Sequence, residues 1–523
     1  MTVRPLNREQ AFLLPPTLDE LIPDDHPARF IAILVDALDR GIWEKLGIEL
    51  EGESLGAPSY HPRALLSVWL YGFMTGMRSS RKLEAACRDQ MPYLWLTGWQ
   101  HPDHNTLWRF YKAHREQMRH LFKLSVRAAV KMGLIDLAIQ AVDGTKIVAN
   151  ASKHRTYNRK GLDRLLKHMD EVIREMEKEN EDGSDQVPVH LPEKLRKAKQ
   201  LQREVKAAIK QLGEEDRDEV NLTDGDASLM KSRQGIVAGY NVEAVVSVLK
   251  PEEAGRKGLF LTAVDAVNDP DDHGQLIPML DQAEENTGKK ADISLADAGF
   301  HSGANLALCD ERRQKVAMPE AQEKALKQPY HKDRFIYDAD SDTYQCPCGQ
   351  DLRFIWLKAS GNRKLRIYRG SGAVCRKCSA FGQCTRNYRQ GRELQVGEYE
   401  VVLRRHREWM TTEEAKELYR RRKEMIEPAF GIIKEQMGIR RFFLRGWDSV
   451  RAEAATLAVA FNLRTLYSMW QVWSNAKKSE LVTVLKETGQ PVTLKFALFL
   501  SATIVNYILP VFRRYYFILQ GTY

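Results

Sequence analysis

The apolar run LIDLAIQAVDGTKIVAN, residues 134–150, constrains the fold more than any other stretch of the chain. Its first half is rich in Leu, Ile, Ala and Val, which predicts a buried strand over residues 137–142. The run then meets Asp143 and continues through Gly144, Thr145 and Lys146. A carboxylate directly after a strand built for burial needs a chemical reason, because an ionised group is costly to remove from water.

Three further segments rich in Val, Ile and Leu predict strands that join this one in a single sheet: residues 239–249, 259–267 and 291–299. Between the first two strands lies a strongly charged stretch, 159–218, in which two amphipathic helices are separated by a break at 183–192. We interpret this stretch as a helical hairpin inserted into the sheet domain. Its charges fit a solvated face better than a binding motif.

Residues 18–133 carry apolar side chains at spacings of three and four, which predicts an all-helical amino-terminal domain. One of its helices, with Asn105 as the expected N-cap, carries a row of basic side chains that includes Arg109 and Arg115. Such a helix suits contact with DNA. A solvated basic face explains the same pattern equally well.

The chain is therefore expected to divide into five parts. They are a helical DNA-binding domain (1–133), the first part of a sheet domain with its helical insertion (134–328), a cysteine-rich subdomain (329–395), the closing helices of the sheet domain (396–475) and a tail of unassigned role (476–523).

Composition limits the classes of partner. The 523 residues include 79 Lys and Arg against 70 Asp and Glu, a formal charge of +9. This balance favours a polyanion such as nucleic acid, although a well-solvated basic enzyme has the same composition. No secretion signal opens the chain, so a cytoplasmic location is expected. The longest apolar stretch, 496–509, is shorter than the roughly 18 residues of a membrane span and predicts a core helix.

Three carboxylates on separate elements suggest a metal site. Asp143 and Asp297 each follow a predicted strand, at the edge where open α/β sheets place their sites, and Glu427 lies in a late helix with Thr412 as its N-cap. Like charges resist being ionised together unless cations neutralise them, and a sparse acidic set suits two Mg²⁺ ions. Singly, each acid is explained as well by a turn, a helix cap or a surface position. Nearby acids, Asp272 among them, are interpreted as turn residues.

The late helix has two distinct faces. Lys423, Glu427 and Lys434 recur at helical spacing on one side, and apolar residues recur on the neighbouring side. Lys434 would then contact backbone phosphate, which positions DNA without reading its sequence. Pro428 directly after the glutamate predicts a kink or a late helix start.

Five of the seven cysteines fall in one segment as a C-x-C pair and a C-x₂-C-x₅-C group: Cys346, Cys348, Cys375, Cys378 and Cys384. In a cytosolic chain this spacing favours a structural zinc site built from four thiolates, with one cysteine to spare. A reduced, metal-free cluster is the alternative.

The segments AVDGTKIVANAS, LADAGFHS and RRRKEMIEPAFGIIKEQMGIRRFFLRG occur in this order, behind a helical domain and with the cysteine segment before the last. In this combination they resemble a bacterial insertion-sequence transposase of the DDE type, over roughly residues 10–475. The resemblance implies a ribonuclease-H-like mixed sheet flanked by helices, with Asp143, Asp297 and Glu427 as first, second and third acid. Lys434 falls at the family's usual distance beyond the glutamate, whereas Lys423 stands where the family often has Arg.

The same resemblance implies an enzyme that cuts at the ends of its mobile element with two Mg²⁺ (or Mn²⁺) ions held by the three acids. The freed 3′-hydroxyl is joined to target DNA, and a homodimer on double-stranded DNA is expected, with no membrane. The basic residues expected to contact DNA are Lys434, Lys423, Arg420, Arg421, Arg422, Lys146, Arg109 and Arg115. Two other hypotheses stay open: a ribonuclease-H-like nuclease without strand transfer, and an inactive DNA-binding protein derived from a transposase.

Overall fold

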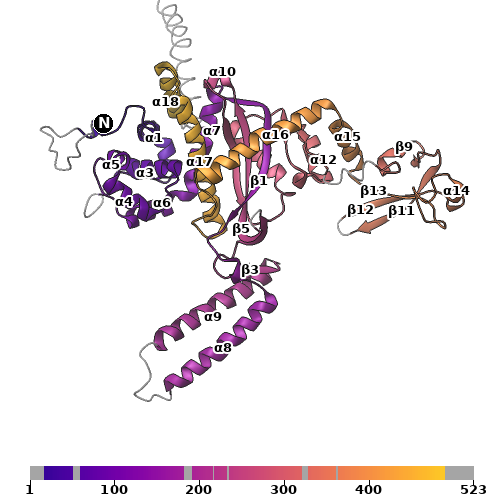
Figure 1. Cartoon of the computed structure of the whole chain (residues 1–523), viewed down its shortest axis with the longest axis horizontal. Coiled ribbons are helices and arrows are strands. Elements are labelled where there is room, and N and C mark those ends of the chain that lie inside the picture. The colour runs from indigo at the N-terminus through magenta and orange to yellow at the C-terminus, as the bar shows by residue number, and fades with distance from the viewer. Residues whose placement is uncertain are drawn as a thin grey trace, which may run out of the picture.

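The computed structural model describes residues 17–50, 59–181, 191–215, 217–232, 235–320, 328–360 and 363–488. It shows a mixed α/β protein in which a central sheet is flanked by helices, and two smaller parts project from this body (Figure 1). The predicted fold class, a ribonuclease-H-like mixed sheet with an amino-terminal helical part, is confirmed.

The central sheet has six strands. In order they are β4 (Ser228–Ser232), β5 (Gly235–Leu249), β1 (Ile135–Val148), β7 (Ile293–Leu295) and β8 (Lys315–Ala317), with β6 (Leu259–Val267) also paired to β5. Strands β1, β5 and β6 are antiparallel, whereas β1, β7 and β8 are parallel. Pairing of β1 with β7 sets Ala141 beside Leu295, so Asp143 on β1 and Asp297 after β7 come to lie near each other.

Strand β1 is longer than its apolar pattern predicted. It continues six residues beyond Val142, because residues 143–148 pair with residues 239–244 of β5. Asp143 therefore lies inside a paired strand, opposite Ala244, and the expectation that it ends the strand is wrong. Apolar content marked only the part of the strand that is covered on both faces.

The two faces of the sheet are covered by different helices. Val142 packs on one face with α11 (Leu276–Thr287) and α12 (Gly303–Glu311). Ala141 packs on the opposite face in the large core that includes α17 (Trp447–Trp470). Because successive side chains in a strand point to opposite faces, Asp143 faces the same side as Ala141.

The secondary structure of the amino-terminal part consists of helices alone in its described residues. Its elements are η1 (Leu18–Leu21), α1 (Pro27–Asp36), α2 (Arg40–Lys45), α3 (Pro62–Thr75), α4 (Ser80–Asp89), α5 (Met91–Thr97), α6 (His104–His114), η2 (Arg115–Gln117) and α7 (Met118–Lys131). The prediction that Asn105 is the N-cap is wrong, because Asp103 caps α6 by accepting the Thr106 N–H at 2.7 Å. These helices share one hydrophobic core with α17 and the sheet.

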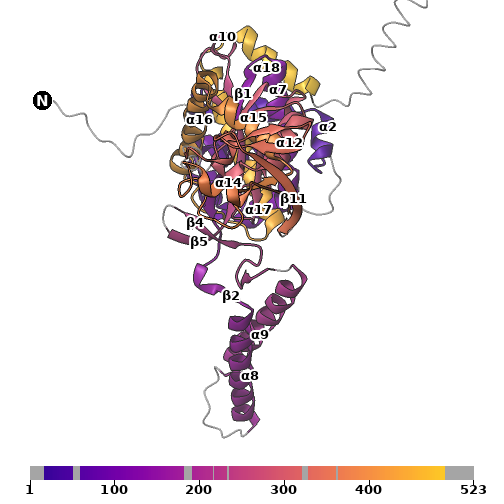
Figure 2. The ribbon, with the colours of Figure 1, turned by 90° about the vertical axis from the view of Figure 1, so that its right-hand side faces the viewer.

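The predicted helical hairpin is present. It consists of α8 (Arg159–Glu181) and α9 (Leu191–Glu214), and most of the expected break at 183–192 lies outside the described residues. At its base η3 (Lys153–Arg155) leads into β2 (Thr156–Asn158), which pairs with β3 (Glu219–Asn221). The two helices extend away from the body and pack on each other (Figure 2).

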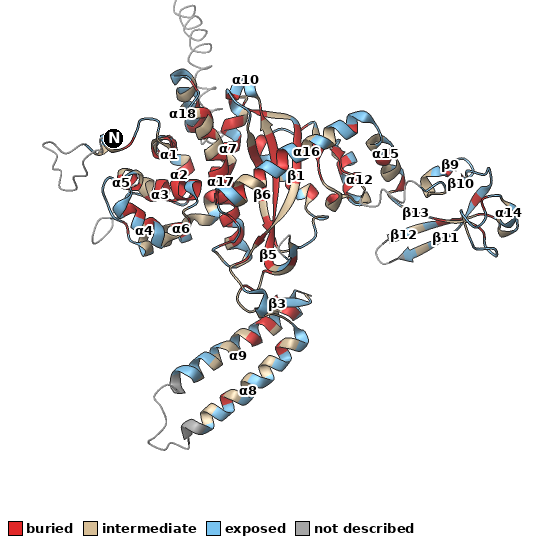
Figure 3. Cartoon of the chain, viewed as in Figure 1, coloured by how far each residue is buried: buried red, intermediate tan, exposed pale blue. Residues whose placement is uncertain are grey.

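The cysteine-rich segment forms a second sheet, in the order β13 (Glu393–Gly397), β12 (Arg363–Arg369), β11 (Asp351–Ser360), β10 (Thr343–Gln345) and β9 (Ile336–Asp338). The short helix α14 (Gly372–Lys377) and the turn η5 (Lys332–Arg334) belong to the same part. It has a small core of its own, and few of its residues are buried (Figure 3).

The closing helices are α15 (Glu400–Met410), α16 (Glu413–Gly431), the π-helical turn η6 (Ile432–Gln436), α17 and α18 (Asn475–Thr488). Thr412 is the N-cap of α16, as predicted, and accepts the Ala415 N–H at 3.3 Å. The helix begins directly after Thr412 and continues through Pro428, so it has no late start. Its irregular part is the π-turn that follows. Among the described helices none is long and apolar enough to span a membrane. The apolar stretch 496–509 lies outside the described residues.

Candidate active site

Asp143 and Asp297 lie at one site beneath α16. Asp297 follows β7 at the start of the turn η4 (Ala298–Phe300), and its Oδ1 accepts the Gly299 N–H at 2.7 Å. The Nη2 of Arg422 is 2.8 Å from Oδ2 of Asp143 and 3.7 Å from Oδ2 of Asp297. A single guanidinium therefore reaches both carboxylates. The structure brings together the first two acids that the sequence singled out.

The electrostatics of this site favour a bound cation. Burial raises the pKa of Asp143 to about 6, and the negative charge of Asp297 adds to the rise, while Arg422 opposes it. The side chain of Asp143 is 16% exposed. A carboxylate that is costly to ionise beside another carboxylate is stabilised by positive charge, which here comes from Arg422.

Helix α16 and η6 pass over the site from one end to the other. Arg422 contacts the two acids, and twelve residues later the Nζ of Lys434 lies 2.5 Å from Oγ1 of Thr145 on β1. Glu427 lies between them along this helix and is exposed, and its carboxylate has no hydrogen-bond or ion-pair partner within the described ranges. Among the described residues no three His, Cys, Asp or Glu side chains are grouped as a metal-ion site. The third acid is thus on the covering helix but is not assembled with the other two.

A second polar cluster adjoins this site and was missed from the sequence. A Cβ at Gly299 would lie 2.9 Å from Oδ1 of Asp297 and 3.1 Å from Oδ2 of Asp272, a member of the cluster. Lys146 donates to the Pro270 carbonyl at 2.9 Å and pairs with Asp272 at 3.0 Å. Asn241 donates to both Asp272 and the fully buried Glu243. The sequence predicts Asp272 only as a turn residue, whereas the structure pairs it with Lys146. Lys146, predicted to contact DNA, instead contacts Asp272 and Pro270.

Glu243 is the most perturbed acid of this cluster. Burial, followed by the negative charge of Asp272, raises its pKa to about 9, so the side chain is protonated at neutral pH. Its Oε2 has no partner in the described part of the chain. Gly144 makes the space, because a Cβ there would lie 2.7 Å from Oε1 of Glu243. A glutamate inside the apolar strand GYNVEAVVSVL was the available sequence signal.

The remaining basic residues are spread over two surfaces. On α16, Arg420 pairs with Glu417 at 2.7 Å, Arg421 is half-buried, and Lys423 is exposed. On the amino-terminal part, Arg109 is exposed on α6, and Arg115 begins η2. Arg422 was predicted to contact DNA, and the structure shows it on the two acids instead of in solvent.

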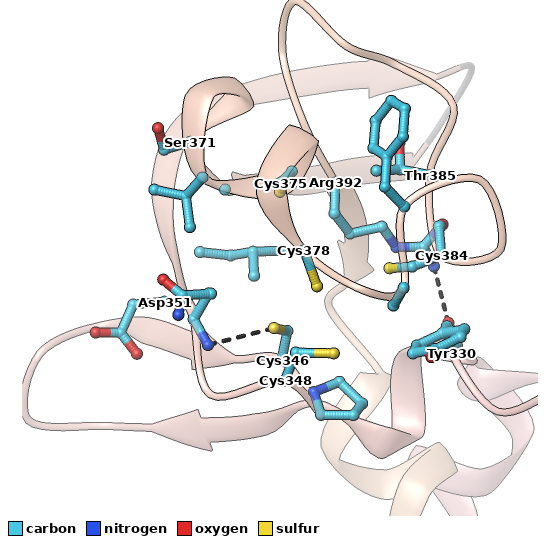
Figure 4. Close-up of a pocket in the computed structure, with 17 residues that line it drawn as sticks. Tyr330, Cys346, Cys348, Asp351, Ser371, Cys375, Cys378, Cys384, Thr385 and Arg392 are labelled. Carbon is cyan, nitrogen blue, oxygen red and sulfur yellow. Dashed lines mark hydrogen bonds between the residues drawn. The ribbon is translucent and has the colours of Figure 1, made fainter.

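The five clustered cysteines line one cavity of about 50 Å³ in the cysteine-rich part (Figure 4). The Gln350 N–H donates to Sγ of Cys346 at 3.3 Å. The thiol of Cys378, hydrogen-bonded to Cys348, raises the pKa of Cys348 to about 11. Cysteines of the C-x-C pair and of the C-x₂-C-x₅-C group thus lie on the same cavity.

Comparisons with known families match two segments of the chain. A model described as a transposase DDE domain matches residues 345–467, and one described as a transposase domain (DUF772) matches residues 16–113. No curated protein and no solved structure gives a significant match. The two family matches confirm the resemblance to insertion-sequence transposases of the DDE type.

The matched segments also define how far this similarity reaches. They include the five clustered cysteines, Glu427 and Lys434, and most of the amino-terminal helices. They do not include Asp143 or Asp297. Transposases act on DNA, and their DDE domains generally use divalent metal ions such as Mg²⁺, so both are implied for a chain of this kind.

Proposed function

We propose that this protein is a DNA transposase that cuts at the ends of its own mobile element and joins the freed 3′-hydroxyl ends to target DNA. The observation that carries the proposal is the pair Asp143 and Asp297, both reached by Arg422 beneath α16 and η6, which bear Glu427 and Lys434. The two family matches and the net positive charge support a DNA substrate.

The carboxylates of Asp143, Asp297 and Glu427 would hold two Mg²⁺ ions. The first two fit this role, because they are close enough to share one cation-bearing group and Asp143 is costly to ionise without one. Bound metal would activate the attacking water or 3′-hydroxyl and stabilise the leaving oxygen. Arg422 contacts both acids, so metal binding would require it to move and Glu427 to approach from its exposed position on α16.

The protein's other task is to position the DNA strand. Lys434, on η6 above Thr145, would bind a backbone phosphate next to the acids, and the exposed Lys423 would bind one further along α16. Once released from the acids, Arg422 would bind the charge that develops on the phosphate being cut. Two element ends must be held together, so we propose that a homodimer acts on DNA.

We also propose a structural zinc ion in the cysteine-rich part. The C-x-C pair and the C-x₂-C-x₅-C group line one small cavity, and four thiolates are the ligand set of a closed tetrahedral site. In the described residues these thiols are not yet grouped as a metal-ion site, so zinc binding would draw them together. Zinc content of the purified protein, measured by mass spectrometry, tests this. We expect one zinc per chain, lost in Cys378→Ser and kept in Cys309→Ser, a control at a buried cysteine outside the cluster. A wild type without zinc would contradict the proposal.

Cleavage of labelled DNA that spans the end of the encoding element tests the main proposal. We expect nicking in Mg²⁺ but not in EDTA, reduced at least about a thousandfold in Asp143→Asn and in Glu427→Gln. Glu424→Gln, which changes another exposed glutamate three residues earlier on α16, is the matched control and should cleave normally.

Three other results would change the conclusion. Cleavage that survives both substitutions would remove these acids from the mechanism. Cut ends that never join a target would favour a ribonuclease-H-like nuclease. Binding of DNA without any cleavage would favour an inactive DNA-binding protein.

A further inference from the structure

The hairpin of β11 and β12 exposes an uninterrupted apolar run. Ile355, Trp356 and Leu357 are 50%, 49% and 60% exposed, and none of them belongs to a hydrophobic cluster of the described residues. The indole N–H of Trp356 has no hydrogen-bond partner within the described ranges. Buried apolar side chains stabilise a fold, whereas a run left in water marks an interaction surface.

A bulge in β11 divides this run between the two faces of the hairpin. Phe354 pairs with Tyr368 and Trp356 pairs with Ile367, so Ile355 is the extra residue. Leu357 then pairs with Arg366, one position further along. Trp356 and Leu357 consequently point to opposite faces of the sheet at its β11 edge, and a flat partner could cover only one of them. Their partners on β12, Ile367 and Arg366, pair in turn with Gln395 and Val396 on β13.

Neighbouring side chains show that the run is separate from the core. Phe354, before the bulge, packs edge-on against Tyr368 at 5.8 Å and lies under the Arg366 guanidinium at 4.7 Å. Arg366 in turn pairs with Asp342 at 2.6 Å. The hairpin is therefore anchored on its own sheet, in which β12 stays paired with β13 from Arg369 to Leu365. After Arg353, β11 is an edge strand of the described sheet.

The charge around the run is positive. Arg353, Lys358 and Lys364 flank it on the two strands, and none forms a salt bridge within the described part of the chain. Residues 328–398 contain thirteen Lys and Arg against seven Asp and Glu. A partner for this ribbon must accept apolar and aromatic contacts between positive charges, which is the chemistry of stacked bases between phosphates.

We propose that the β11–β12 ribbon inserts into DNA. Trp356 and Leu357 contact and unstack bases, while Arg353, Lys358 and Lys364 bind the flanking phosphates. The tip of the hairpin, where Ala359 pairs with Lys364, is two-stranded and narrow enough to enter the major groove. The edge of β11 behind this tip would bring Trp356 and Leu357 to the DNA. The inference rests on the proposed function only in taking DNA as the substrate, and assigns the ribbon to deforming that DNA.

Permanganate reactivity of thymines reports unstacked bases and tests the proposal. The full-length protein is incubated with element-end DNA in Ca²⁺ or without metal, so that cleavage does not interfere. We expect enhanced reactivity with the wild type, its loss in the double variant Trp356→Ser/Leu357→Ser, and about tenfold to hundredfold weaker binding of the variant. Val401→Ser, at a 76% exposed apolar position on α15, is the control and should leave both within about twofold.

The test separates this inference from the proposed function. Asp143→Asn should keep the enhanced reactivity and lose cleavage. Unstacking by the wild type, with no cleavage when Mg²⁺ is added, would contradict the transposase proposal but not the ribbon's role. Cleavage with unchanged thymine reactivity, or equal DNA affinity in the double variant, would overturn the ribbon's role. So would a DNA-free dimer that the double variant dissociates in sedimentation, because the ribbon would then bind a second copy of the chain.

Discussion

The body of the molecule and its two projecting parts are stabilised in different ways. The amino-terminal helices, the sheet and α17 share one hydrophobic core. The helical hairpin and the cysteine-rich part each have a small core that includes no residue of the body. The boundary predicted at residue 133 is therefore a change from helices to a sheet, and the parts on its two sides share one hydrophobic core.

A buried ion pair shows how closely the body is joined. Arg78, after α3, pairs with Glu453 of α17 at 2.7 Å, and their side chains are 4% and 2% exposed. Glu453 also accepts the backbone N–H groups of Phe443 and Leu444 at 3.0 Å. The loop that follows η6 is thereby attached to both halves of the body.

The largest expected effect comes from breaking this junction. Glu453→Ala leaves Arg78 buried without its counter-charge and should reduce the free energy of unfolding by about 3–5 kcal/mol. Urea unfolding monitored by circular dichroism measures the change. Asp36→Ala, which breaks the exposed pair with Arg63, is the control and should cost less than about 1 kcal/mol. Equal effects from the two variants would mean that the body is not one cooperative unit.

A smaller and local effect is expected in the helical hairpin. Leu212→Ala removes a buried side chain from the core shared with Leu162 and Val205, and should destabilise the hairpin by roughly 2–3 kcal/mol. Hydrogen exchange should show lost protection in α8 and α9 and unchanged protection in β1. Leu280→Ala, in the core beneath α11, should show the reverse. Lost protection throughout the protein in Leu212→Ala would contradict the independence of the hairpin.

The smallest expected effect depends on pH. Because the folded-state pKa of Glu243 is raised to about 9, this group favours the fold most at low pH, and its contribution is lost as pH rises from about 5 towards 9. Glu243→Gln cannot ionise, so its free energy of unfolding relative to the wild type should rise from pH 5 to pH 8. The rise should stay below the limit of about 4 kcal/mol that three pH units set at about 1.4 kcal/mol each. Urea unfolding at the two pH values measures it.

The matched control is Glu417→Gln, at an exposed position on α16. It should show the same pH dependence as the wild type. A parallel curve for Glu243→Gln would mean that the acid is ionised in the folded protein and that Lys146 and Asn241 compensate its charge.

Local patterns in the sequence were enough for several features. Strand β6 lies at the predicted residues, the two helices of the insertion are where their amphipathic periodicity placed them, and Thr412 caps α16. These features depend on side chains a few positions apart along the chain. The resemblance to DDE-type transposases likewise rests on ordered local motifs and is confirmed by the two family matches.

Long-range contacts decided the rest. The pairing of β1 with β5 extends the strand past Asp143, and the passage of α16 over β1 brings Arg422 onto two acids that lie far before it in the chain. The cluster around Glu243 arises because Gly144 and Asp272 approach it from other elements. The sequence by itself determined strand β6, the two helices of the insertion and the candidate acids Asp143 and Asp297. Only the tertiary structure decided which charges meet, because burial and Coulomb interactions depend on distance in space and not on separation along the chain.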